Sequence, residues 1–168
     1  MILVINLKTY PSGIGKNAEK LAVLCREAER KTKTKIFLAP QAADINRTSR
    51  IIPTLSQHVD YFPAERATGF ITPEEIKANG AVGSIINHSE HKLSLEEIKK
   101  TIERCRLLRL RTFVCAANLK EVKSIIPLKP YAIAYEVPEL IATGKSISKV
   151  KASSERKFSH LLNGKGII

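Results

Sequence analysis

The chain has 168 residues, of which 43% are hydrophobic, so it is long enough for one domain with a sizeable core and is neither disordered nor fibrous. No apolar run reaches the roughly 18 residues that a membrane span requires, and the apolar start lacks the basic residues of a signal peptide. Three widely spaced cysteines without a Cys-x-x-Cys pair indicate a reducing cytoplasm and argue against a disulfide scaffold or a zinc site.

The formal net charge of +12 is the one compositional feature that suggests a nucleic-acid partner. The basic residues are dispersed along the chain, however, which is typical of a solvated basic surface. Only 5% of the residues are aromatic and none is Trp, so a platform for stacking bases is not expected. We therefore expect no nucleic-acid partner, with a basic nucleic-acid-binding protein as the alternative.

Strand-like runs alternate with helical patterns along the whole chain. Apolar residues recur at helical spacing over residues 17–31, and two segments, 72–75 and 94–97, have the pattern of a helix start with a capping box. The expected strands are 3–6, 35–39, a weak one at 57–61, 82–86, 111–115 and 131–135, with the start of a seventh at 166–168. The expected helices are 17–31, one starting at 72, one starting at 94, 119–126 and 154–162.

Strands separated by helices predict parallel pairing with right-handed crossovers, which is the α/β class. No linker or repeat divides the chain, so we expect a single domain over residues 1–168. A closed eight-stranded TIM barrel typically needs about 250 residues. The six or seven βα units found here therefore predict an incomplete TIM (β/α)8 barrel.

Polar side chains stand at the ends of three of the expected strands or just after them. Asn6 ends the first strand and Lys8 lies two residues after it, His88 lies two residues after the fourth, and Glu136 directly follows the sixth. In an α/β barrel the loops after the strands carry the chemistry. Asn, Lys, His and Glu together form a set suited to moving a proton next to a carbonyl.

These motifs resemble those of the triosephosphate isomerase family, in its short archaeal form. Residues 6–10 (Asn-Leu-Lys-Thr-Tyr) resemble the first-strand motif, residues 87–90 (Asn-His-Ser-Glu) the fourth-strand motif, and residues 136–144 the sixth loop. Residues 57–60, residues 80–83 and Cys115 also fit, and the resemblance extends over residues 1 to about 150. It implies an isomerase of glycolysis and gluconeogenesis that needs no cofactor or metal and acts on a phosphorylated triose.

The resemblance also implies a role for each strand-end residue. Glu136 would be the base that removes a proton from the carbon next to the carbonyl, and His88 would polarise the carbonyl and move protons between the two oxygens. Lys8 would stabilise negative charge on the enediolate, and Asn6 would help to hold the substrate oxygen. The resemblance further implies a neutral histidine in a site from which a loop excludes water.

Phosphate binding is implied for Lys8 and for Ala142, Thr143 and Gly144 in the sixth loop. Ala142 stands where the family usually has Gly, and Ala restricts φ, so phosphate binding could be weakened. Val137 stands where the family usually has Pro, at the first hinge of this loop. Loops after a seventh and eighth strand, which complete the phosphate site in the family, are not found in the 168 residues.

Two residues are expected to support the site, and a third could suggest a metal site instead. We expect Glu90 to be a partner of Lys8, and Cys115 to pack against the site rather than to act as a nucleophile. His91, three residues after His88, would suggest a metal pair, but the pair lacks a third ligand. A non-catalytic, truncated remnant of the family is the alternative to an active isomerase, and a homo-oligomer, tetramer or dimer, is expected of the intact family member.

Overall fold

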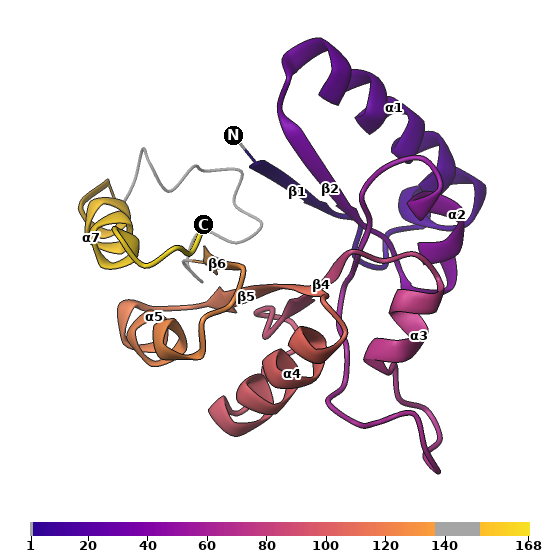
Figure 1. Cartoon of the computed structure of the whole chain (residues 1–168). Coiled ribbons are helices and arrows are strands. Elements are labelled where there is room, and N and C mark those ends of the chain that lie inside the picture. The colour runs from indigo at the N-terminus through magenta and orange to yellow at the C-terminus, as the bar shows by residue number, and fades with distance from the viewer. Residues whose placement is uncertain (1, 137–151) are drawn as a thin grey trace.

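The computed structural model describes residues 2–136 and 152–168 and has alternating strands and helices (Figure 1). The strands are β1 (Ile2–Asn6), β2 (Lys35–Ala39), β3 (Leu55–Ser56), β4 (Gly83–Ile86), β5 (Arg111–Ala116) and β6 (Ala132–Tyr135). The α-helices are α1 (Lys16–Thr32), α2 (Ile45–Ser49), α3 (Pro73–Ala78), α4 (Leu95–Leu107), α5 (Leu119–Ile125) and α7 (Ala152–Leu162). Short 3-10 helices are Pro11–Gly13, Ala42–Asp44 and Ile126–Leu128.

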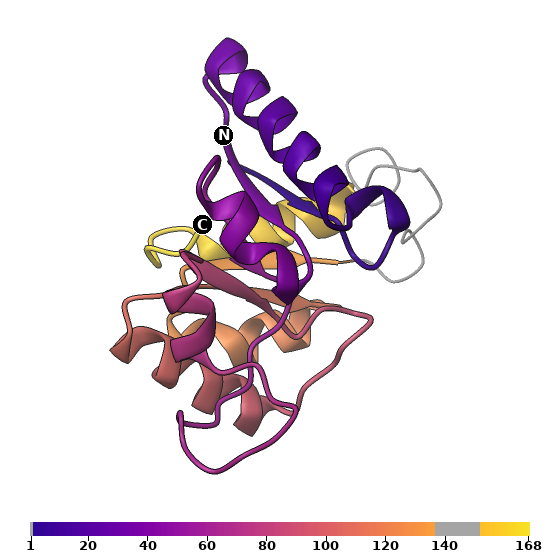
Figure 2. The ribbon, with the colours of Figure 1, turned by 90° about the vertical axis from the view of Figure 1, so that its right-hand side faces the viewer.

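The strands pair in parallel and in chain order. β1 pairs with β2, and β3 to β6 form a second ladder. A parallel bridge between Leu38 and Thr54 joins the two ladders. Helices cover the outer side of the curved sheet, and a side view shows the strands in the middle with helices around them (Figures 1 and 2). The architecture is the expected one, an incomplete TIM barrel.

The sheet continues beyond β6 through a single residue. The amide of Ile168 donates to the carbonyl oxygen of Tyr131 at 3.2 Å, and the carbonyl oxygen of Ile168 accepts from the amide of Ile133 at 3.0 Å. These two bonds have the spacing of a parallel ladder. The expected start of a seventh strand at 166–168 is therefore reduced to Ile168 lying beside β6.

The weak strand expected at 57–61 is wrong, because the third strand is the two-residue segment Leu55–Ser56. The next residues turn into a loop because their backbone groups find other partners. The hydroxyl of Ser56 donates to the carbonyl oxygen of His58 at 2.5 Å. Asp60 exchanges hydrogen bonds with Ile71, each at 2.8 Å, through its amide and its carboxylate. The segment is thus tied to the loop before α3 rather than to a neighbouring strand.

One of the two expected capping boxes forms completely. Ser94 and Glu97 make both reciprocal bonds at the start of α4. At α3, Thr72 accepts from the amide of Glu75, but the Glu75 carboxylate binds the side chain of Asn79 at 2.6 Å. That second box is therefore only half formed, because the Glu75 carboxylate accepts the side-chain amide of Asn79 instead of the backbone amide of Thr72.

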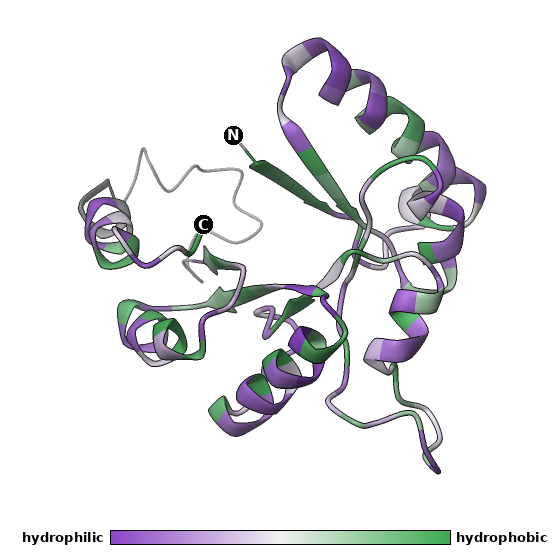
Figure 3. Ribbon diagram, viewed as in Figure 1, coloured by the Kyte–Doolittle hydropathy of each residue, from purple (hydrophilic) through white to green (hydrophobic). Residues whose placement is uncertain are grey.

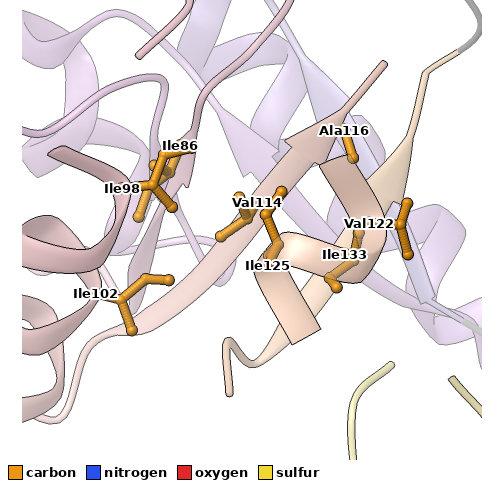
Figure 4. Close-up of a cluster of buried hydrophobic side chains, with 8 residues drawn as sticks. All are labelled: Ile86, Ile98, Ile102, Val114, Ala116, Val122, Ile125 and Ile133. Atoms are coloured by element: carbon orange, nitrogen blue, oxygen red, sulfur yellow. The ribbon is translucent and has the colours of Figure 1, made fainter. Parts of the chain in front are cut away.

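Two apolar layers hold the sheet in place, and alternate residues of each strand belong to different layers. Ile85 and Phe113 face the interior of the curve, whereas Ile86 and Val114 face α4 and α5. The strands accordingly bury apolar residues on both faces, and Figure 3 shows that they are largely hydrophobic along their length. The part of the outer layer beside β4 to β6, drawn in Figure 4, consists of Ile86, Ile98, Ile102, Val114, Ala116, Val122, Ile125 and Ile133. Leu95, in the first turn of α4, lies outside both layers and is 49% exposed.

Candidate active site

The carboxyl ends of β1, β4 and β6 bring three of the expected site residues to one cavity. Asn6 is the last residue of β1, His88 lies two residues after β4, and Glu136 directly follows β6. All three line a cavity of about 180 Å³, together with the apolar or neutral side chains of Val4, Ile85, Phe113, Cys115 and Ala134. Parallel pairing places these ends at the same edge of the sheet, so residues far apart in the chain can act on one small molecule.

His88 and Glu136 are in direct contact. The distance from His88 Nε2 to Glu136 Oε1 is 3.3 Å, and the side chains are 15% and 22% exposed. The other carboxylate oxygen, Oε2, accepts the amide of Ser89 at 3.1 Å. The amide of Glu136 itself donates to the carbonyl oxygen of Ala116 at 2.8 Å, which fixes the backbone at the end of β6. The carboxylate is therefore oriented and largely shielded from water.

The hydrogen bonds of His88 define its tautomer. The amide of Glu90 donates to His88 Nδ1 at 3.1 Å. Because a backbone amide can only donate, Nδ1 is the acceptor and carries no proton. The ring is then neutral, with its single proton on Nε2, which faces Glu136. This arrangement offers a neutral hydrogen-bond donor beside a carboxylate.

Lys8 lies next to the cavity and is paired with a second carboxylate. Its Nζ is 2.8 Å from Glu90 Oε1, as expected for these two residues. This hydrogen bond raises the pKa of Lys8 and lowers the pKa of Glu90. Lys8 has a φ of +49°, and its amide donates to the side-chain oxygen of Asn6 at 2.9 Å. The cation is thus held in a left-handed turn at the end of β1.

Sequence reasoning missed the roles of Asn87 and Ser89 in shaping this loop. Asn87 is buried, has a φ of +60°, donates through Nδ2 to the carbonyl oxygen of Cys115 at 2.8 Å and accepts the amide of Leu93 at 2.9 Å. Asn tolerates left-handed backbone better than most residues. An Asn directly after a buried strand was therefore the available signal for Asn87, whereas nothing in the sequence distinguished the amide of Ser89.

Cys115 lines the cavity from β5. Burial, followed by the nearby Glu136 carboxylate, raises the pKa of its thiol well above the usual range. A protonated thiol is a poor nucleophile, so this position offers apolar volume rather than covalent chemistry.

Some expected positions lie outside the described residues, and His91 is described but is not among the residues that line the cavity. Val137 and the implied phosphate residues Ala142, Thr143 and Gly144 lie outside the described residues. The His91 ring stacks on His58, with centroids 4.0 Å apart. Among the residues described, no three His, Cys, Asp or Glu side chains gather as metal ligands. None of the helices in residues 2–136 and 152–168 combines the length and the apolar character needed to span a membrane.

A larger cavity, of about 380 Å³, lies between the starts of α4 and α5. Its carboxylate, Glu121, already accepts Lys92 Nζ at 2.9 Å and the amide of Ala117 at 3.0 Å. No histidine lines it. The smaller cavity at the strand ends is therefore the better candidate for acid–base chemistry.

Comparison with known proteins identifies the family of the chain. The family model of triosephosphate isomerase matches residues 1–160. Triosephosphate isomerase of Methanobacterium bryantii is 41% identical over 150 residues, which cover 88% of this chain and 66% of the relative. The enzyme of Metallosphaera sedula is 36% identical over 152 residues, covering 89% and 67%, and that of Methanocaldococcus jannaschii is 38% identical over 151 residues, covering 89% and 69%.

The chain thus spans about two thirds of the length of the curated relatives that it matches. The match includes the ends of β1, β4 and β6, where the cavity lies. The family model covers far more than half of the chain, and the identities exceed 35%. The chain belongs to the triosephosphate isomerase family.

Proposed function

We propose that the protein interconverts dihydroxyacetone phosphate and glyceraldehyde 3-phosphate by proton transfer, without a cofactor. The observation that carries the proposal is the contact between the neutral His88 ring and the Glu136 carboxylate inside a small cavity. A base and a neutral donor held 3.3 Å apart can act on adjacent carbon and oxygen atoms of one substrate.

The proposed reaction starts when Glu136 removes a proton from the hydroxymethyl carbon of dihydroxyacetone phosphate. The electrons of that C–H bond form a carbon–carbon double bond, and the carbonyl electron pair moves to its oxygen. His88 Nε2–H donates a hydrogen bond to this oxygen and then moves a proton between the two oxygens of the enediol. Glu136 returns its proton to the neighbouring carbon, which yields glyceraldehyde 3-phosphate and regenerates the base.

Electrostatics favour the enediolate intermediate over the uncharged carbonyl group of the bound substrate. The negative charge that develops on oxygen needs donors that are already in position in a site with little water. His88 and Asn6 line the cavity, and the Lys8 cation lies beside it, paired with Glu90. We propose that Lys8 also binds the substrate phosphate, together with Ala142, Thr143 and Gly144.

The proposal includes the setting of the enzyme. We take residues 1–168 as a single partial barrel domain that acts in the cytoplasm on a phosphorylated triose. We propose no nucleic-acid or membrane partner for it. The intact family member is proposed to form a homo-oligomer. All three cysteines are free and buried, which fits a reducing compartment. The inner and outer apolar layers share the strands β4 to β6, which fits a single folding unit.

The experiment is a turnover assay of purified 1–168, with folding checked by circular dichroism, alongside Glu136→Gln. A general base contributes about 10² to 10⁴ in rate, so we expect kcat of Glu136→Gln to fall by at least about 100-fold. Glu65→Gln, an exposed carboxylate in the loop between β3 and α3, is the matched control and should retain full activity. A folded chain without turnover, or undiminished turnover in Glu136→Gln, would contradict the proposal.

A further inference from the structure

We propose that Gln57 is the positioning residue that holds Lys8 in its working place at the candidate active site. Gln57 lies in the loop directly after β3, one strand away from β2 and two away from β1. It does not line the 180 Å³ cavity, and of the two residues its side chain binds, Lys8 is the one with a proposed role in the chemistry. The kinetic part of this inference rests on the proposed function.

The carboxamide of Gln57 ties together the ends of β1 and β2. Its Nε2 donates to the carbonyl oxygen of Lys8 at 2.9 Å and to that of Ala39 at 3.0 Å. Both partners are carbonyl oxygens, which can only accept, so the nitrogen rather than the oxygen of the amide must face them. The two hydrogens of a single NH₂ group are thus fully used in joining two strand ends.

The position of this clamp coincides with an unusual backbone conformation. Lys8 has a φ of +49°, a left-handed conformation that a residue other than glycine keeps only when its surroundings impose it. The amide of Lys8 is held by Asn6 Oδ1 at 2.9 Å, and its carbonyl oxygen is held by Gln57. The peptide groups on the two sides of Lys8 are therefore each held by a different side chain.

The backbone conformation decides where the side chain goes. From this turn Lys8 Nζ reaches Glu90 Oε1, 2.8 Å away in the loop after β4 that also carries His88. If the carbonyl clamp is removed, the turn can relax and the ammonium group loses its fixed place relative to Glu90. Misplacement of a charged group by about 1 Å can lower a rate by about 100-fold.

The test compares Gln57→Met, which keeps the length of the side chain but donates no hydrogen bond, with Gln41→Met. Gln41 is the other glutamine of the chain, lies at the same edge of the sheet after β2 and makes no capping bond through its side chain. Thermal melting followed by circular dichroism sets a temperature at which both variants are folded. At that temperature kcat/KM is measured, and the Glu90 carboxyl group is titrated by NMR.

We expect kcat/KM of Gln57→Met to fall by about 10- to 100-fold. We also expect the Glu90 pKa, which its hydrogen bond with Lys8 holds below the ordinary value, to rise toward that value. Both quantities should stay unchanged in Gln41→Met. A residue that only stabilised the fold would lower the melting temperature and leave the Glu90 pKa of the folded protein as it is.

An unchanged Glu90 pKa in folded Gln57→Met overturns the inference, whatever happens to turnover. If the wild-type chain shows no turnover, the proposed function fails for residues 1–168. The Glu90 titration still decides whether Gln57 positions Lys8, so the two failures can be told apart.

Discussion

The two ends of the sheet use left-handed backbone for different purposes. At the amino end, Lys33, Arg109 and Lys129 have φ of +55°, +58° and +53°, and each follows a helix and precedes a strand. Their amides donate to backbone carbonyl oxygens of the preceding helical turn at 2.9 to 3.1 Å. These residues end helices, a task that glycine or asparagine usually performs.

At the carboxyl end, Lys8 and Asn87 have φ of +49° and +60°; Asn87 follows β4 directly and Lys8 lies two residues after β1. Side chains rather than helical backbone hold these two turns. The side chains of Asn6 and Gln57 bind the peptide groups of Lys8. The side-chain carboxamide of Asn87 binds the carbonyl oxygen of Cys115 and the backbone amide of Leu93. Strained backbone that is held by side chains beside a cavity is typical of functional sites.

The largest effect on stability is expected from Asn87→Ala. The substitution leaves the carbonyl oxygen of Cys115 and the amide of Leu93 without their side-chain partner and places Ala at a φ of +60°. Unpaired buried groups cost about 1–3 kcal/mol each, and the left-handed backbone adds about 1–2 kcal/mol. Urea unfolding should show a loss of about 3 kcal/mol or more.

Asn87→Gly is the matched control for this change. Glycine tolerates the left-handed turn but also lacks the amide, so it should recover only the part of the loss that is due to backbone strain. Equal stability of Asn87→Ala and wild type would contradict the view that side-chain bonds hold this turn.

A smaller, pH-dependent effect is expected from Glu90→Gln. The pKa of Glu90 is lowered by its bond with Lys8, so its contribution is present above the ordinary value of 4.5 and is lost as the pH falls through the folded-state value. The raised pKa of Lys8 keeps the pair charged up to and beyond 10.5. The wild-type advantage should be at most about 1 kcal/mol at neutral pH, because the pair is partly exposed.

Unfolding curves at pH 7 and in acid measure this advantage. It should be constant through the neutral range and vanish in acid below the folded-state pKa of Glu90. An advantage that persists after Glu90 is protonated would show that the pair is not what joins the loops after β1 and β4.

The smallest effect is expected at the amino end, from Lys33→Gly. Glycine suits the left-handed turn but gains freedom in the unfolded chain, and the two effects oppose each other. The free energy of unfolding should stay within about 1 kcal/mol of wild type, with turnover unchanged. A loss as large as that of Asn87→Ala would remove the distinction between the two ends of the sheet.

Much of the fold was predictable because it depends on local patterns. Helical periodicity placed α1 and the Ser94–Glu97 capping box placed the start of α4, each to within a residue, and runs of apolar residues placed the strands other than β3. The error at residues 57–61 arose because tertiary bonds of Ser56 and Asp60 turn the chain away from the sheet. A two-residue strand carries too little pattern to be located from sequence.

The site was predictable in part, and for a different reason. Polar residues after strands pointed to Asn6, Lys8, His88 and Glu136, and the first, third and fourth of these line the same cavity. The clamps that hold them were not predictable from spacing. Gln57 binds a residue 49 positions away, and the amide of Ser89 binds a carboxylate 47 positions away. Such contacts exist only after the sheet has curved.

Deuterium exchange tests the central claim, proton transfer by Glu136, most directly. Purified 1–168 is incubated with dihydroxyacetone phosphate in D₂O, and NMR follows the hydrogens on the hydroxymethyl carbon. The account predicts that the folded wild-type chain replaces one of these hydrogens with deuterium, and that Glu136→Gln does so at least about 100-fold more slowly. A folded wild-type chain that incorporates no deuterium, or equal incorporation by Glu136→Gln, would contradict it.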